Sequence, residues 1–244
     1  MYIASINLRI NVDVDGLNAW PYRKKKMIDF ILKENFDFIG CQEASPLMIS
    51  DLTEGIGHLY DVVFEPRDER GESTPIFYKK TNQPVACGTK WLTDTPNVLS
   101  QIKGSHFPRI VTYARFKDVL LFNTHLDYAS DDVCHKQATF LVDIIKHIAY
   151  EKEPIVITGD FNMKPHSKTI SFMETEFKTC YHQPSDHLLT YHAFTDETKG
   201  QPIDYIFYSN HFYPERFNIH HHEKKHVYMS DHYPISVYLS KFRF

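Results

Sequence analysis

The sequence predicts an α+β fold in which two mainly antiparallel β-sheets pack together and helices cover their outer faces. Three observations lead to this prediction. Segments with strand character outnumber the helical ones, the breaks between many of them are short enough for hairpins, and the helical segments fall between groups of strands. A doubly wound parallel sheet would need a helix after nearly every strand. The chain has no linker, low-complexity tract or fixed-period repeat, so we expect residues 1–244 to form one domain.

The amino-terminal half begins with an alternating strand over residues 2–9. Pro21 opens a helix to about Asn35, because proline is favoured at the first helical position and apolar residues recur there with helical spacing. A short strand over 36–43 ends in polar residues, and 46–54 has a helical pattern. Strand patterns then follow over residues 59–64, 75–80, 84–92, 109–116 and 118–125.

The second half continues with a hairpin turn predicted at residues 117–118. Ser130 is expected to cap a long helix that runs to about Tyr150. An apolar strand over 154–160 follows, and then a short helix near 167–176. We expect the remainder of the chain to be mostly strand, including residues 202–209 and 233–239.

Composition and charge are those of a globular protein without a generally basic surface. The chain is 42% hydrophobic and 24% charged, and its net charge is −4. Proteins that hold nucleic acid mainly through phosphate neutralisation are usually basic. The one dense basic run, residues 23–26, starts the first helix and is interpreted as a solvated helix face. We see neither a signal peptide nor an apolar stretch of about 20 residues, so a cytoplasmic location is expected.

The cysteines and one histidine-rich segment do not favour a zinc site. The four cysteines are far apart and include no C-x-x-C pair, which argues against a zinc knuckle or a disulfide framework. Cys41 and Cys87 lie in apolar runs and are predicted to be core residues. In the segment 220–226, strand alternation would split the three consecutive histidines between two faces. A solvated edge is therefore favoured there over a metal site.

Apolar strands end repeatedly in polar side chains that a core would not choose. In V-I-T-G-D-F-N, Gly159 allows a sharp turn, and Asp160 and Asn162 project to one face while Phe161 packs on the other. Any one such residue has a structural explanation, such as a turn or a helix cap. Burying all of them without partners would be costly, and a shared metal-bearing cleft removes that conflict. The polar strand ends are Asn7, Glu43, His125, Asp160, Asn162, Asp204, Asp231 and His232.

Six short segments carry a family resemblance that spans residues 7 to 232. They are S-I-N-L-R, C-Q-E-A-S, F-N-T-H-L-D-Y, T-G-D-F-N, P-I-D-Y-I and M-S-D-H-Y-P, in this order. The set resembles the endonuclease/exonuclease/phosphatase superfamily, which has the deoxyribonuclease I-like fold. The resemblance implies a four-layer α/β sandwich and cleavage of a phosphoester with the help of a divalent metal.

The chemistry of the residues agrees with that resemblance. Mg²⁺ prefers oxygen ligands, and Glu43 is the natural carboxylate ligand, with Asn7 and Asp231 near the same ion. Mn²⁺ is expected to substitute. The metal would act as a Lewis acid on a phosphoryl oxygen and on the leaving group. His232 is predicted to be a general base or a group that polarises the phosphate, with Asp204 fixing its orientation and tautomer.

By the family pattern, Asp160 positions or deprotonates the attacking water, and Asn162 hydrogen-bonds the phosphate. Whether Asp160 or the His232 pair is the base stays open, and we prefer Asp160 aided by His232. His125 resembles the second histidine of the deoxyribonuclease and sphingomyelinase branches, where it assists the phosphate or the leaving group. Glu72 is either the carboxylate that orients His125 or a surface acid, with equal weight.

Two further residues have weaker assignments. Arg109 is a phosphate clamp or a salt bridge at a sheet edge, because guanidinium groups bind phosphate oxygens in a bidentate manner. The T-Y-H segment of residues 190–192 is a lesser candidate for lining the cleft, because His192 precedes the Asp204 segment.

The leading functional hypothesis is a Mg²⁺-dependent hydrolase of phosphoesters. A small, lipid or sugar phosphate is slightly favoured as substrate over DNA or RNA, because the chain lacks a basic insertion and aromatic residues interleaved with basic ones. A nuclease of the same superfamily is the alternative within this chemistry. Two hypotheses of other kinds are a catalytically silent binding protein on this fold and a zinc hydrolase that uses the histidine-rich segment.

Overall fold

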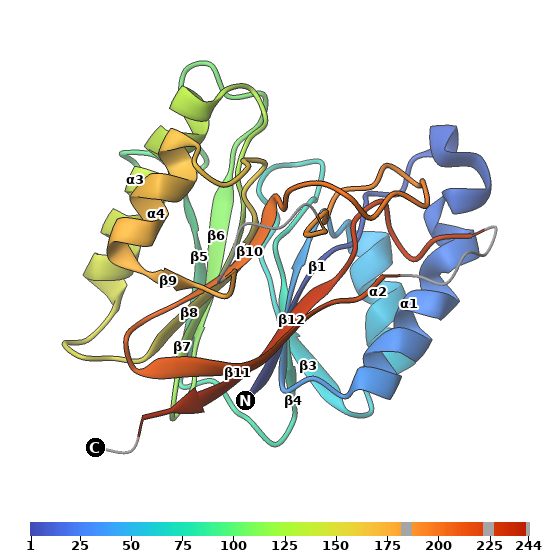
Figure 1. The fold of residues 1–244 in the computed structure, drawn as a ribbon, viewed down its shortest axis with the longest axis horizontal. Helices are drawn as coiled ribbons and strands as arrows, with labels where there is room; N and C mark the ends of the chain where they lie inside the picture. The colour runs from blue at the N-terminus through green and yellow to red at the C-terminus, as the bar shows by residue number, and fades with distance from the viewer. Residues whose placement is uncertain (182–186, 222–226, 243–244) are drawn as a thin grey trace.

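The structure, a computed structural model, describes residues 1–181, 187–221 and 227–242, and its elements form four layers (Figure 1). Helices α3 and α4 cover the outer face of one sheet, and α1 and α2 cover that of the other. The two sheets face each other in the middle. The α/β sandwich implied by the family resemblance is therefore confirmed. The helices are α1 (Trp20–Glu34), α2 (Pro46–Ile56), α3 (Asp131–Ile148) and α4 (Lys168–Glu176).

In the described part of the chain, each sheet has six strands and is mainly antiparallel, as predicted. The exceptions are the parallel pairs β1–β2 and β7–β8. The first sheet has the order β11 (Phe212–Ile219), β12 (Ile235–Lys241), β1 (Tyr2–Asn7), β2 (Phe38–Gln42), β4 (Ile76–Lys79) and β3 (Tyr60–Val63). The second has the order β5 (Ala86–Trp91), β6 (Ile110–Arg115), β7 (Leu120–His125), β8 (Ile155–Asp160), β10 (Asp204–Tyr208) and β9 (Lys178–Thr179).

The apolar side chains of the central strands alternate between two cores. In β1, Ile3 packs between the sheets, whereas Ala4 and Ile6 pack beneath α1 and α2. In β8, Val156 packs between the sheets and Ile157 packs against the α3 and α4 side. Successive side chains of a strand point to opposite faces. Strands covered on both faces therefore need continuous apolar runs, and their first polar residues appear where the cover ends.

Most predicted elements are present, with ends that shift by no more than two residues. The hairpin turn at 117–118 is confirmed, since Phe116 N–H donates to the carbonyl of Val119 at 2.8 Å. The prediction that the remainder is mostly strand is wrong between β9 and β10. Described residues there form only isolated bridges, such as the one between Tyr191 and His232. This segment instead supplies loops over the polar end of the sheets. A 3₁₀ helix at Asp13–Asn18 was not predicted.

The prediction that residues 23–26 form a solvated helix face is wrong for Arg23, which is fully buried. Arg23 lies on the inward face of the helix together with Met27 and Ile31. It is buried because of this helical spacing, despite its charge. The guanidinium donates to the carbonyls of Leu8 and Arg9, and to those of Asn18 and Met229 at 2.7 and 3.0 Å. It thus ties together the chain segments on either side of the polar strand ends.

Replacing Arg23 with Met should destabilise the fold, because buried carbonyls that now accept charged hydrogen bonds would lose their donor. We expect a loss of about 2–4 kcal/mol in the free energy of unfolding. Urea denaturation of Arg23→Met measures this loss. Lys25→Met, on the exposed face of the same helix, is the control and should stay within about 0.5 kcal/mol of the wild type. An equally small effect for Arg23→Met would refute the structural role.

Cys41 is buried as predicted, but Cys87 is exposed, so that prediction is wrong. Cys87 lies near the start of β5, the edge strand of its sheet, whereas Thr89 and Trp91 on the same face of the strand are buried. No helix in the described part of the chain is long and apolar enough to cross a membrane.

Candidate active site

The polar strand ends meet at one edge of the sandwich. The carboxyl ends of β1, β2, β7 and β8 lie there, together with the amino ends of their antiparallel neighbours β4, β6, β10 and β12. A cleft of about 530 Å³ opens at this edge. Eight of the ten predicted site residues line it, and Asn7 and Asp204 are buried against lining residues. The lining residues among the predicted ones are Glu43, Glu72, Arg109, His125, Asp160, Asn162, Asp231 and His232.

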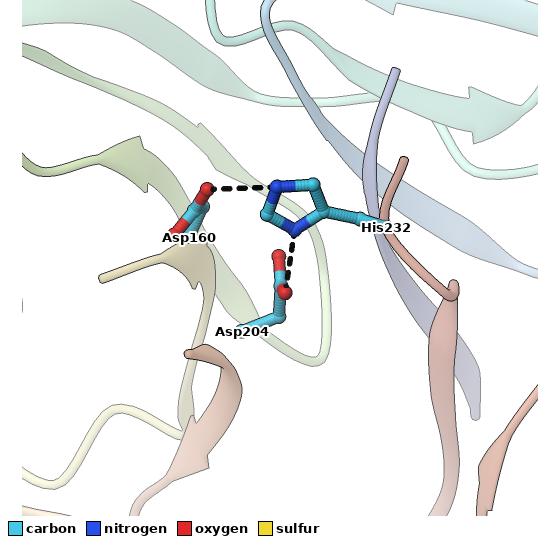
Figure 2. Close-up of side chains that lie close together, drawn as sticks. All are labelled: Asp160, Asp204 and His232. Carbon is cyan, nitrogen blue, oxygen red and sulfur yellow. Dashed lines mark hydrogen bonds and ion pairs between the residues drawn. The ribbon is translucent and has the colours of Figure 1, made fainter. Parts of the chain in front are cut away.

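His232 lies between two buried carboxylates (Figure 2). Its Nδ1 is 2.8 Å from Asp204 Oδ2, and its Nε2 is 3.7 Å from Asp160 Oδ2. Burial by itself lowers the pKa of His232, but Asp204 and Asp160 outweigh burial and raise that pKa to about 10. The imidazole is therefore a cation at neutral pH. Its Nδ1–H is held by Asp204, and its Nε2–H is directed toward Asp160 and the cleft.

Asp160 is almost fully buried at the end of β8. Asn7 Nδ2 donates to its Oδ2 at 2.9 Å, and the backbone N–H of Asn162 donates to its Oδ1 at 2.8 Å. Burial, with a further contribution from Asp204, raises the pKa of Asp160 to about 7. A carboxylate with that pKa can take up a proton near neutral pH.

The predicted metal ligands lie on the wall formed by the ends of β1 and β2 and the segment before β12. Glu43 Oε1 accepts from Asn7 Nδ2 at 3.1 Å, and its Oε2 accepts from Ile10 N–H at 2.9 Å. Burial, together with the charge of Glu43, raises the pKa of Asp231. Asp231 and Glu43 therefore repel each other when both are charged. A hard divalent cation bound between such carboxylates would offset this repulsion. The Asn7 amide oxygen accepts from the backbone of Arg9, so in this arrangement Asn7 positions the acids.

The oxygen-rich donors fit magnesium better than zinc. In the described part of the chain, no cysteine lines the cleft. Asp160, Asp204 and His232 also lie close enough to hold an ion, but the His232–Asp204 hydrogen bond already explains their contact. In the histidine-rich segment, His220 contacts the Phe30 ring and hydrogen-bonds Ser236, so it does not form a solvated edge as predicted. Residues 222–226 lie outside the described residues.

His125 and Asn162 form a second polar pair in the cleft. Asn162 Nδ2 donates to His125 Nε2 at 3.1 Å and to the Leu126 carbonyl at 3.0 Å. Burial and the nearby Arg109 lower the pKa of His125 well below 6.5, so the ring is neutral. Its Nδ1 is 3.9 Å from Glu72, which is too long for a hydrogen bond. Glu72 is therefore a buried acid of the cleft and not a surface acid, but it does not hydrogen-bond His125.

Eight further residues line the cleft, and only Tyr191, in the T-Y-H segment, had been considered for it: Arg9, Ile10, Arg67, Arg70, Phe107, Tyr128, Tyr191 and Ile203. Arg9 and Tyr128 lie in two of the short family segments, S-I-N-L-R and F-N-T-H-L-D-Y, and this position could have identified them as site residues. In the T-Y-H segment considered for the cleft, His192 does not line it, because its ring is buried against that of Tyr233. Its neighbour Tyr191 reaches the cleft instead, with its ring centroid 5.0 Å from that of His232.

Three cleft residues adopt the left-handed backbone conformation: Arg9, Glu43 and Asn162, with φ of 54°, 56° and 53°. This conformation is uncommon for residues other than glycine and costs about 1–3 kcal/mol where it is strained. Each of the three directly follows a strand or comes two residues after its end. The turn away from strand geometry directs these side chains into the cleft, and such strain is typical of functional sites.

The sequence matches the endonuclease/exonuclease/phosphatase family over residues 10–232. This span contains every predicted site residue except Asn7. A search of curated proteins found no match.

Solved structures share the fold over nearly the whole chain. An endonuclease/exonuclease/phosphatase from Bacteroides vulgatus is 29% identical, with a TM-score of 0.90 and coverage of 99% of this chain and 98% of that one. A mannosyl-6-phosphatase from Bacteroides thetaiotaomicron is 25% identical, with a TM-score of 0.90 and coverage of 98% and 99%. The human Nocturnin catalytic domain is 17% identical, with a TM-score of 0.78 and coverage of 99% and 93%, and shows similarity of fold alone.

Proposed function

Because the chain belongs to the endonuclease/exonuclease/phosphatase family, whose members are phosphoesterases, we propose that it is a Mg²⁺-dependent phosphoesterase that acts on a small phosphorylated molecule, with a sugar phosphate first among the candidates. The observation that carries the proposal is the convergence of Glu43, Asp160, Asp231 and the His232–Asp204 pair on one cleft.

Size and charge support a small substrate. A cleft of about 530 Å³ is in the range of small-molecule sites, roughly 300–1,000 Å³. A nucleic-acid interface needs a larger basic surface, and the net charge of this chain is −4. The exposed rings of Tyr128 and Tyr191 line the cleft and offer apolar faces to a sugar ring. The similar protein from Bacteroides thetaiotaomicron is described as a mannosyl-6-phosphatase, which agrees with a sugar phosphate.

We propose that Glu43 and Asp231 hold the Mg²⁺ ion, with Asn7 fixing the Glu43 and Asp160 carboxylates. When bound, the ion would supply Lewis-acid stabilisation of the charge that develops on phosphoryl and leaving-group oxygens. Mn²⁺ is expected to substitute, because both ions take oxygen ligands.

Asp160 is proposed to orient the attacking water and accept its proton, because its pKa of about 7 suits a general base at neutral pH. His232 is already protonated, with a pKa of about 10, so it is suited to donate to a phosphoryl oxygen instead of acting as the base. Asp204 fixes its tautomer and orientation. The neutral His125 and Asn162 also line the cleft, and the phosphate contacts expected of them stay a prediction.

A panel of substrates tests the proposal with phosphate or p-nitrophenol release as the readout, in the presence of Mg²⁺. The panel comprises mannose 6-phosphate, glucose 6-phosphate, nucleotides, phosphoinositides, sphingomyelin, p-nitrophenyl phosphate, bis(p-nitrophenyl) phosphate and abasic DNA. We expect the highest kcat/KM on a sugar phosphate. A preference for DNA or RNA would replace the proposal with the nuclease alternative. No activity on any substrate of the panel would favour a binding protein on this fold.

A further inference from the structure

Two buried arginines, Arg67 and Arg109, line the cleft, and both lie over the same phenyl ring. The guanidinium carbon of Arg67 lies 4.4 Å from the centroid of the Phe107 ring, and that of Arg109 lies 5.4 Å from the same centroid. Both side chains are almost fully buried, yet both line the cleft. We call these three residues the arginine wall. Such cation–π contacts hold guanidinium groups in place without consuming their hydrogen-bond donors.

Each arginine is anchored by one buried acid and keeps donors free. Arg67 Nη1 donates to Glu72 Oε1 at 2.6 Å. The buried Nε of Arg67 lies 3.6 Å from Asp68 Oδ2, which is too long for a hydrogen bond, and it has no hydrogen-bond partner among the described residues. Arg109 donates through Nε to Asp127 Oδ2 at 3.3 Å. Its two terminal nitrogens make no hydrogen bond to any residue that the structure describes. A guanidinium group has five N–H donors, so most of those in the wall await an acceptor.

Asp127 holds the Arg109 side of the wall in place. Its carboxylate is fully buried and accepts from Ser105 Oγ at 2.8 Å and from the backbone N–H of His106 at 3.0 Å. It also accepts from the backbone N–H groups of Tyr128 and Ala129, each at 2.9 Å. These bonds join the loop that carries Phe107 to the loop that follows β7. The wall is therefore rigid before a ligand binds, which lowers the entropic cost of binding.

The wall lies next to the proposed reaction centre, beyond His125 from Asp160. His125 Nε2 is 3.6 Å from Asp160 Oδ2, and on its other side His125 Nδ1 is 3.9 Å from Glu72, the partner of Arg67. A phosphate held beside Asp160 and the metal ligands would thus lie between these residues and the free N–H donors of the wall.

The chemistry of the wall distinguishes classes of phosphoester. A phosphate monoester carries up to two negative charges and three non-bridging oxygens, whereas a diester carries one charge and two such oxygens. Burying two guanidinium groups with unused donors is costly unless a ligand accepts from them. Planar guanidinium groups match phosphate oxygens in a bidentate manner. The wall therefore suits the additional oxygen and charge of a monoester.

Building on the proposed function, we propose that Arg67 and Arg109, stacked on Phe107, bind the terminal oxygens of a phosphate monoester dianion and make this protein a phosphomonoesterase instead of a phosphodiesterase. The wild type should then hydrolyse p-nitrophenyl phosphate in preference to bis(p-nitrophenyl) phosphate. It should also bind inorganic phosphate more tightly than dimethyl phosphate, which presents one charge.

The test compares Arg67→Gln and Arg109→Gln with the wild type on both model esters, with calorimetry of inorganic phosphate in parallel. We expect kcat/KM for the monoester and the affinity for phosphate to fall about 10- to 100-fold, the effect of losing charged hydrogen bonds. The diester rate should change less than about threefold, within the effect of a non-specific surface change. Arg67→Lys keeps the charge and should recover part of the loss. Arg216→Gln, an exposed residue on β11, is the matched control with no expected effect.

The outcomes separate this inference from the proposed function. Equal losses on both esters, or unchanged phosphate affinity in both glutamine variants, would overturn the role of the wall while leaving a phosphoesterase. A wild type that is inactive on all phosphoesters but binds phosphate through Arg67 and Arg109 would refute the proposed function and keep the wall as an anion site. Thermal melting shows which variants are folded. If Arg67→Gln does not fold, Arg109→Gln tests the inference by itself.

Discussion

Asp160→Asn should reduce kcat by about 10²–10⁴-fold, the contribution of a well-placed acid or base. The change is isosteric, and the new side-chain oxygen can still accept from the backbone N–H of Asn162, as Asp160 Oδ1 does at 2.8 Å. What disappears is the negative charge beside the His232 and His125 rings, the acceptor for Asn7 Nδ2 and the site that takes a proton from water. Steady-state kinetics on the best substrate of the panel measures the loss.

The same substitution should leave stability equal to or higher than that of the wild type in EDTA. Burial raises the pKa of Asp160 from 3.8 to about 7, so the folded state binds the proton more tightly than the unfolded state. The charged carboxylate therefore costs stability as the pH rises from about 4 to 7, and the full cost applies above pH 7. Asparagine removes that cost. A melting temperature at pH 8 that is unchanged or raised, with kcat lost, is the expected combination.

A surface substitution of the same type provides the control. Asp132→Asn, on the exposed face of α3, should change neither kcat nor the melting temperature. If Asp160→Asn keeps more than a tenth of the wild-type kcat, Asp160 is not the base that we propose. If it unfolds the protein, Asp160 is mainly a structural acid.

Glu43→Gln should weaken Mg²⁺ binding and lower kcat/KM by about 10²-fold or more, because a metal ion contributes several kcal/mol of charge stabilisation. Glu43 lies at the end of β2, with one oxygen on Asn7 and the other on the backbone of Ile10. Gln retains the size of the side chain but removes its charge and one oxygen. Mn²⁺ calorimetry measures binding independently of turnover, and activity as a function of Mg²⁺ concentration measures the activation constant.

The expected pattern is a higher activation constant together with weaker Mn²⁺ binding. Glu54→Gln, on the exposed surface of α2, should match the wild type in both measurements. Unchanged Mn²⁺ affinity in Glu43→Gln would place the metal elsewhere in the cleft. The Asp160, Asp204 and His232 group would then be the alternative position.

The site residues at the strand ends were predictable because polar residues in the sequence follow directly after continuous apolar runs. Asp160 and Asn162 follow a run that is apolar on both faces, and the structure brings them to the same edge as Glu43. Hydrophobic patterning and short family segments therefore recovered the fold and the side chains at the strand ends. What a pattern along one strand cannot supply is which other loops reach that edge.

The arginine wall shows this limit. Arg67 and Phe107 come from separate loops and meet only after the two sheets have packed, so no local spacing links them. Arg23 was misjudged because its charge was weighed above its position on the inward helix face. Cys87 was misjudged because the local sequence does not tell which strand becomes the edge of a sheet.

The most direct measurement of the central claim is phosphate release by EDTA-treated protein as individual metal ions are added back. We predict that Mg²⁺ or Mn²⁺ restores hydrolysis in the wild type, whereas neither restores it in Glu43→Gln or Asp160→Asn. Hydrolysis that persists in EDTA, or that returns only with Zn²⁺ and survives Glu43→Gln, would contradict a magnesium-dependent centre at this cleft.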